Sequence, residues 1–98
     1  MSFYLVAAID IHDPETYGIY IEKATAAFQP FVAKQTIMSP LQEAPVVFEG
    51  KAPGHLLVTQ FRSMEDIYEF YNSPGYQEAI PYRNAAATTH YYIAVRGA

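Results

Sequence analysis

The segment from residue 61 to residue 83, FRSMEDIYEFYNSPGYQEAIPYR, places the strongest constraint on how this 98-residue chain can fold. Ser63 precedes two acidic residues and an apolar stripe, which predicts a helix that this serine caps. The dipeptide Ser73-Pro74 predicts that this helix ends and that a second helix begins, with the serine as its cap and the proline in its first turn. Pro81 lies inside the second helical pattern, which extends to Ala87, so we expect a kink or a restart there.

The rest of the chain alternates between strand and helix patterns. Residues 3–11 form a continuous β-rich run, and Asp13-Pro14-Glu15 predicts a helix that ends at Gln29-Pro30. Three further strands and a short edge segment are predicted at residues 32–38, 55–61, 91–96 and 46–49, with a loop at 39–45. The order predicts an α+β domain spanning residues 1–98, a ferredoxin-like βαββαβ sandwich. Right-handed crossovers give an antiparallel sheet of order 4-1-3-2 with the helices on one face.

Composition and charge argue against several classes of function. The chain carries a net charge of −4 and no run of basic residues, so we expect neither nucleic-acid nor membrane binding. It has no cysteine, which excludes disulfides and thiolate chemistry. The first apolar run has no basic residues before it and is too short to cross a bilayer. We therefore expect a cytoplasmic protein.

The first strand is apolar on both of its faces. Phe3, Leu5 and Ile9 lie on one face, and Tyr4 and Val6 lie on the other. Helices on one side of the sheet cover only one of these faces, and aromatic residues make up 15% of the chain. An uncovered apolar face of this kind predicts a homodimer formed through the open sheet face. The alternative is a monomer with a partly exposed sheet.

Several motifs are similar to those of a known family. They are Glu49-Gly50, Phe61-x-Ser63-Met64-Glu65, Phe70-Tyr71-Asn72-Ser73-Pro74-x-Tyr76-Gln77 and Arg83. With these motifs the chain resembles the DUF1330 family over essentially its whole length. The resemblance implies the dimeric α/β-barrel superfamily, in which two ferredoxin-like sheets pack face to face. That superfamily includes cofactor-free monooxygenases, haem-dependent enzymes, small isomerases and polyketide cyclases, and the family itself implies no settled function.

Three histidines are candidates for acid/base chemistry. His12 follows the first strand, His55 begins the third and His90 precedes the fourth, so the predicted sheet order places all three at one end of the sheet. Imidazoles at that end could transfer protons near neutral pH, and a metal site is a weaker possibility that we do not adopt. The alternative is that they are unrelated, solvent-exposed residues at the edges of loops.

Asp10 and Arg83 are the charged candidates. Asp10 lies on the less apolar face of the first strand, where partial burial would raise its pKa and allow it to act as a base. It could equally cap or pair with another group. Arg83 shares a helical stripe with apolar residues, and a buried guanidinium needs an anion. Its partner is either a protein carboxylate such as that of Asp10 or Glu49, or helix-end carbonyls, or the carboxylate or enolate of a ligand.

Several tyrosines could line a pocket, although aromatic residues at helical spacing more often belong to the core. The candidates for ligand binding are Tyr4, Tyr71, Tyr76 and Tyr92, and Tyr82 and Tyr91 could also contribute. The leading hypothesis is a small homodimeric enzyme without a cofactor, of the isomerase/cyclase or monooxygenase type. It would act on a small aromatic or carbonyl compound. The alternatives are a non-catalytic ligand-binding or structural module and, more weakly, a haem- or metal-binding protein.

Overall fold

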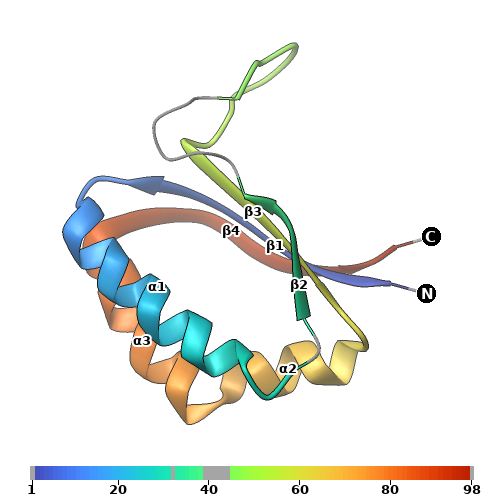
Figure 1. The fold of residues 1–98 in the computed structure, drawn as a ribbon. Helices are drawn as coiled ribbons and strands as arrows, with labels where there is room; N and C mark the ends of the chain where they lie inside the picture. Colours follow the sequence, from blue (N-terminus) through green and yellow to red (C-terminus); the bar gives the residue numbers. More distant parts are fainter. Residues whose placement is uncertain (1, 32, 39–44, 98) are drawn as a thin grey trace.

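The computed structural model describes residues 2–31, 33–38 and 45–97. The elements are β1 (Phe3–Ile11), α1 (Pro14–Phe28), β2 (Ala33–Met38), β3 (His55–Phe61), α2 (Met64–Asn72), α3 (Pro74–Ala86) and β4 (Ala87–Arg96). The strands form one antiparallel sheet in the order β2-β3-β1-β4, and all the helices lie on one face of it (Figure 1). The predicted ferredoxin-like α+β fold and its strand order are therefore confirmed.

The predicted helix starts are confirmed by their caps. The Asp13 carboxylate accepts hydrogen bonds from the Thr16 amide at 3.3 Å and the Thr16 hydroxyl at 2.7 Å. Ser63 accepts from the Asp66 amide at 3.1 Å. Ser73 accepts from the Tyr76 amide at 3.3 Å and donates to the Phe70 carbonyl at 2.7 Å, so one side chain joins the end of α2 to the start of α3. No helix in the described ranges is long and apolar enough to cross a membrane.

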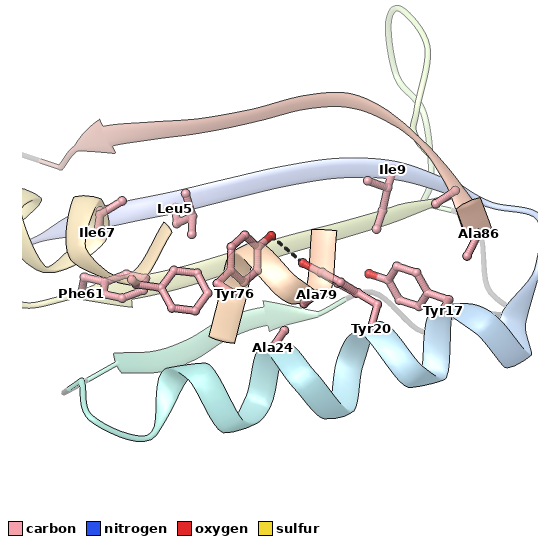
Figure 2. Packing of buried hydrophobic residues seen from close by; sticks show 12 residues of the cluster. Leu5, Ile9, Tyr17, Tyr20, Ala24, Phe61, Ile67, Tyr76, Ala79 and Ala86 are labelled. Carbon is pink, nitrogen blue, oxygen red and sulfur yellow. Dashed lines mark hydrogen bonds between the residues drawn. The ribbon is translucent and has the colours of Figure 1, made fainter. Parts of the chain in front are cut away.

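The core lies between the helices and the sheet (Figure 2). Leu5 and Ile9 on β1 point into it, which leaves Tyr4, Val6 and Asp10 for the opposite face. At the β3–α2 end, aromatic rings fill the layer, and the rings of Phe28 and Phe70 stack with centroids 4.0 Å apart and an interplanar angle of 12°. Toward the N-terminal end of α1 the buried aromatic residues are Tyr17 and Tyr20, which bring hydroxyl groups into the core.

Helix α3 continues through Pro81, so the restart that was one of the two expected outcomes does not occur, and the kink stays a prediction. Two sequence predictions were wrong. Strand β4 begins at Ala87 rather than at residue 91, because Ala87 already pairs with Ile11 of β1, and it directly follows α3. Residues 46–49 form no strand. The predicted loop at residues 39–44 and the predicted strand start at Val32 lie outside the described residues.

Replacing Ser73 with alanine removes both hydrogen bonds that join α2 to α3. We expect a loss of about 1 kcal/mol in the free energy of unfolding, which is the usual cost of losing a helix N-cap. Urea denaturation followed by circular dichroism measures this loss. Asn84→Ala, at an exposed position of the same helix, is the control and should change stability little. Equal effects of the two substitutions would contradict the role assigned to Ser73.

Candidate functional site

Arg83 lies on the face of α3 that packs against the sheet, and only 6% of its surface is exposed. Its Nη1 donates a hydrogen bond of 2.7 Å to the Tyr76 hydroxyl. Its guanidinium carbon lies 4.9 Å from the centroid of the Tyr92 ring and 5.8 Å from that of Tyr20. The buried Nε has no hydrogen-bond partner among the described residues. Arg83 therefore sits in a cage of tyrosines.

The predicted pairing of Arg83 with Asp10 or Glu49 does not form. The ion pairs among the described residues join other groups, at Lys23–Glu78, Arg62–Asp66 and His90–Asp10. Asp10 lies on the opposite face of the sheet from α3, and Glu49 is exposed in the β2–β3 connection. Arg83 is thus a buried cation without a carboxylate partner in the part of the chain that the structure describes.

Burial also keeps the surrounding hydroxyls protonated. It is the main cause that raises the pKa of Tyr17, Tyr76 and Tyr92 above the ordinary tyrosine value, so none of them supplies a negative charge near neutral pH. Burial acts to lower the pKa of Arg83, but its interactions with Tyr76 and Tyr20 outweigh this effect and raise that pKa. The cage therefore keeps a full positive charge.

The tyrosine hydroxyls form a short hydrogen-bond chain that begins at this charge. The hydroxyls of Tyr76 and Tyr20 lie 2.8 Å apart (Figure 2). A guanidinium can only donate, so the Tyr76 oxygen accepts from Arg83. Accepting from a cation polarises the Tyr76 hydroxyl and makes it a better donor, which favours donation from Tyr76 to Tyr20. In that arrangement the Tyr20 proton ends the chain and is available to another acceptor.

Tyr20 lines a cavity of about 70 Å³ between α1 and the sheet, which we call the inner cavity. Its polar lining comes from Tyr20 and Thr25 of α1, Thr59 of β3 and Tyr92 of β4, and the rest is apolar. A second space of about 190 Å³, the outer cavity, lies beside α2 and is lined by Tyr68 and Tyr71 among others. Both cavities include Leu5 and Tyr92, so these two side chains separate them.

The three histidines lie at the same end of the sheet but do not converge. Ile9 of β1 pairs with both His55 and Thr89, the neighbour of His90, and His12 follows β1 directly. His55 is buried in the helix layer, with its ring edge-on to Tyr17 at 6.1 Å. His12 is exposed. No group of three potential metal ligands occurs among the described residues, so the metal-binding alternative gains no support.

Asp10 and His90 meet on the opposite face of the sheet. Ala8 pairs with Tyr91 and Ile9 with Thr89, so His90 is the extra residue of a β-bulge. Its Nε2 lies 2.6 Å from Asp10 Oδ2, and the Gly54 amide donates to Asp10 Oδ1 at 2.7 Å. The hydrogen bond with His90, followed by that from Gly54, lowers the pKa of Asp10. Asp10 is thus exposed and paired, and the expectation of a raised pKa is wrong.

The predicted tyrosines divide between these regions. Tyr76 belongs to the chain from Arg83, and Tyr71 and Tyr92 line the outer cavity. Tyr4 lies on the open face of the sheet, where its ring approaches Gly97, and does not line either cavity. Tyr20, which completes the chain, was not among the predicted site residues. The available signal was a tyrosine instead of a phenylalanine at a buried helical position, since a buried hydroxyl needs a partner.

A family model described as a domain of unknown function, DUF1330, matches residues 2–98. The chain belongs to the DUF1330 family. This membership confirms the resemblance seen in the sequence, and the family model carries no activity with it. No curated protein matches the chain.

Solved structures share the fold of this DUF1330 protein at low sequence identity. The RPA0582 protein of unknown function from Rhodopseudomonas palustris has a TM-score of 0.77 and 16% identity, with 99% of this chain and 82% of that chain covered. SnoaB from Streptomyces nogalater, a cofactor-independent oxygenase, has a TM-score of 0.68 and 9% identity, with 99% and 93% covered. A dimeric protein of unknown function with a ferredoxin-like fold from Bacteroides fragilis has a TM-score of 0.54 and 10% identity, with 98% and 96% covered.

The buried hydroxyls of Tyr76 and Tyr17 should contribute differently to the free energy of unfolding. Tyr76→Phe removes the acceptor of Arg83 and should cost about 2 kcal/mol in the free energy of unfolding. The Tyr17 hydroxyl is buried without a hydrogen-bond partner among the described residues, so Tyr17→Phe should leave stability unchanged or raise it. Chemical denaturation of both variants measures the difference. A similar loss in both would contradict the assigned hydrogen-bond chain.

The pairing of Asp10 predicts a dependence of stability on pH. Its pKa in the folded protein lies below the ordinary aspartate pKa, so the stability it contributes is present above that ordinary pKa and is lost as the pH falls through the lower pKa of the folded state. The melting temperature of Asp10→Asn should therefore lie below that of the wild type near pH 6, and the gap should narrow toward about pH 3. Glu22→Gln, at an exposed position, is the control. A gap that stays constant over this range would contradict the pairing.

Proposed function

We propose that this DUF1330 protein is a cofactor-independent enzyme that binds a small carbonyl compound in the inner cavity and stabilises its oxyanion or enolate. The observation that carries the proposal is the buried, uncompensated charge of Arg83. The Tyr76–Tyr20 hydrogen bond connects this charge to the lining of the inner cavity. The shared fold of SnoaB, described as a cofactor-independent oxygenase, supports the view that such a scaffold can act without a cofactor.

In the proposed mechanism the substrate oxygen accepts a hydrogen bond from Tyr20. Removal of the proton next to the carbonyl moves an electron pair onto that oxygen, and the developing charge strengthens its hydrogen bond with the polarised hydroxyl. An enolate formed in this way can be reprotonated elsewhere, as in an isomerase or cyclase, or can react with oxygen, as in a monooxygenase. Of the four predicted acid/base residues, His55 is the one buried on the helix side of the sheet, and we retain it as the proton carrier. It lies two positions before Leu57, which lines the inner cavity, but its own ring is not part of that lining.

The size of the inner cavity favours a small carbonyl compound over an aromatic one. Its volume is about 70 Å³, whereas apolar cavities of about 150 Å³ are known to hold benzene. An aromatic substrate would need the space of the outer cavity as well. Because Leu5 and Tyr92 separate the two cavities, such a substrate would have to displace the Tyr92 ring.

A non-catalytic ligand-binding module is the second candidate. Two observations favour it: the hydroxyls of Tyr20 and Tyr76 already bond to each other, and the described lining of the inner cavity contains no histidine or carboxylate. Such a module would bind the same small carbonyl compound without turning it over.

We further propose that the protein acts as a homodimer formed through the open face of the sheet. The support is an exposed strip on β4, at Tyr91, Ile93 and Val95, on the side without helices. Exposed apolar strips of this kind mark sites of protein association. Two solved structures with this fold, from Bacteroides fragilis and Thermobifida fusca, are described as dimeric.

The catalytic proposal is tested by deuterium exchange at the carbon next to a carbonyl, followed by NMR in D₂O. We expect the protein to accelerate exchange in acetone or butanone but not in acetophenone, whose ring exceeds the inner cavity. Tyr20→Phe removes the donor at the end of the chain and should reduce this acceleration by about 100-fold or more. Tyr17→Phe is the matched control, and it should retain the wild-type rate.

The other outcomes of the exchange experiment distinguish the catalytic proposal from the non-catalytic module. Equal rates in Tyr20→Phe and Tyr17→Phe would remove Tyr20 from the mechanism. Absence of exchange, combined with ketone-dependent NMR shifts at Tyr20 and Thr59, would support the non-catalytic module. Absence of both exchange and shifts would overturn the assignment of the inner cavity as a ligand site.

A further inference from the structure

The connection before β3 carries three consecutive apolar residues that pack against little of their own chain. Val46, Val47 and Phe48, which we call the apolar arm, are 81%, 48% and 92% exposed. The described part of this connection projects from the sheet on the side away from the helices (Figure 1). Exposing three adjacent apolar side chains is costly in water, so a covering surface is expected.

The open face of the sheet offers a matching surface. Tyr91, Ile93 and Val95 alternate along β4 and are 43%, 46% and 42% exposed; we call them the β4 strip. They pair in register with Ala8, Val6 and Tyr4 of β1, so the surface continues across the sheet. The arm and the strip carry no charge. Their contact would therefore bury no charge of its own, and the high cost of an unpaired buried ion would not arise.

One chain therefore carries both an apolar projection and an apolar face on the same side of the sheet. The 92% exposure of Phe48 shows that this side chain does not pack on the strip of its own chain. Later in the same connection, residues 51–53 line a space together with Tyr91, so Ile93 and Val95 are the more open part of the strip. In a dimer with twofold symmetry each contact occurs twice, so the arm of each copy can meet the strip of the other. A single complementary pair of surfaces is then sufficient to close the assembly at two subunits.

We propose that in the homodimer the apolar arm of each protomer packs on the β4 strip of its partner. The occupant of the open face is thus a second copy of this chain, with Phe48 as the anchoring side chain. This inference rests on the proposed homodimer, which it deepens by assigning the contact that holds it together. Large aromatic side chains that become fully buried dominate the affinity of most interfaces.

Sedimentation equilibrium measures the contribution of the arm to dimerisation. Phe48→Asp should weaken the dimer by about thirtyfold or more, the change expected for a dominant interface side chain. The monomer should stay folded because Phe48 is exposed in it. Ile19→Asp is the matched control, since Ile19 is exposed on α1, on the other side of the molecule. It should leave the dimerisation constant unchanged.

Cross-linking identifies the surface that the arm contacts. The natural sequence has no cysteine, so introduced thiols are the only ones present. When Phe48→Cys and Ile93→Cys proteins are mixed and mildly oxidised, we expect a disulfide between the two different chains, identified by mass spectrometry. The mixture of Ile19→Cys with Ile93→Cys is the control and should not give the corresponding product.

The outcomes separate the arm contact from the dimer itself. A dimer that is weakened in Phe48→Asp and cross-linked between positions 48 and 93 supports the proposal. A wild-type dimer that is unchanged by Phe48→Asp and forms no such cross-link overturns the arm contact and leaves the homodimer standing. A wild-type protein that stays monomeric at high concentration overturns both, and the catalytic proposal for the inner cavity is then judged by the exchange experiment alone.

Discussion

The charge of Arg83, held between α3 and the sheet, is the interaction on which the candidate site depends. A buried guanidinium is costly unless its donors are satisfied, and here the partner is the Tyr76 hydroxyl rather than a carboxylate. The rings of Tyr20 and Tyr92 supply the remaining contacts through their faces. The positive charge is therefore shielded from water but not neutralised. The guanidinium does not line the inner cavity itself. Through the hydroxyls of Tyr76 and Tyr20, however, its charge can polarise the hydrogen-bond donor that does.

The sheet divides the molecule into two chemically distinct sides. On the helix side, Leu5 and Ile9 of β1 pack into the core, and the inner cavity opens between α1 and the sheet. On the open side, Asp10 is tied to His90 and Gly54, and apolar side chains of β4 remain exposed. Because alternate residues of a strand point to opposite faces, β1 contributes both to the lining of the inner cavity and to the open face through which we propose that the protein dimerises.

Local signals in the sequence were sufficient for most of the fold. The caps at Asp13, Ser63 and Ser73 act within a few residues, so the helix starts could be predicted. The continuation of α3 through Pro81 and the start of β4 could not be predicted, because they depend on packing and strand pairing with distant segments. Arg83 was recognisable from its place in an apolar stripe. Its partner was not, since the choice between Asp10 and Tyr76 depends on which face of the sheet each side chain reaches.

The sequence by itself determined the order of elements, the strand order that follows from right-handed crossovers, and the burial of the Arg83 side chain. Periodicity, capping residues and chirality are local properties, and each can be read from neighbours along the chain. Only the tertiary structure decided that His55 and His90 point to opposite faces and that Tyr20 meets Tyr76 across the core. Those contacts join residues far apart in sequence, and a bulge or a register shift of one residue would change them.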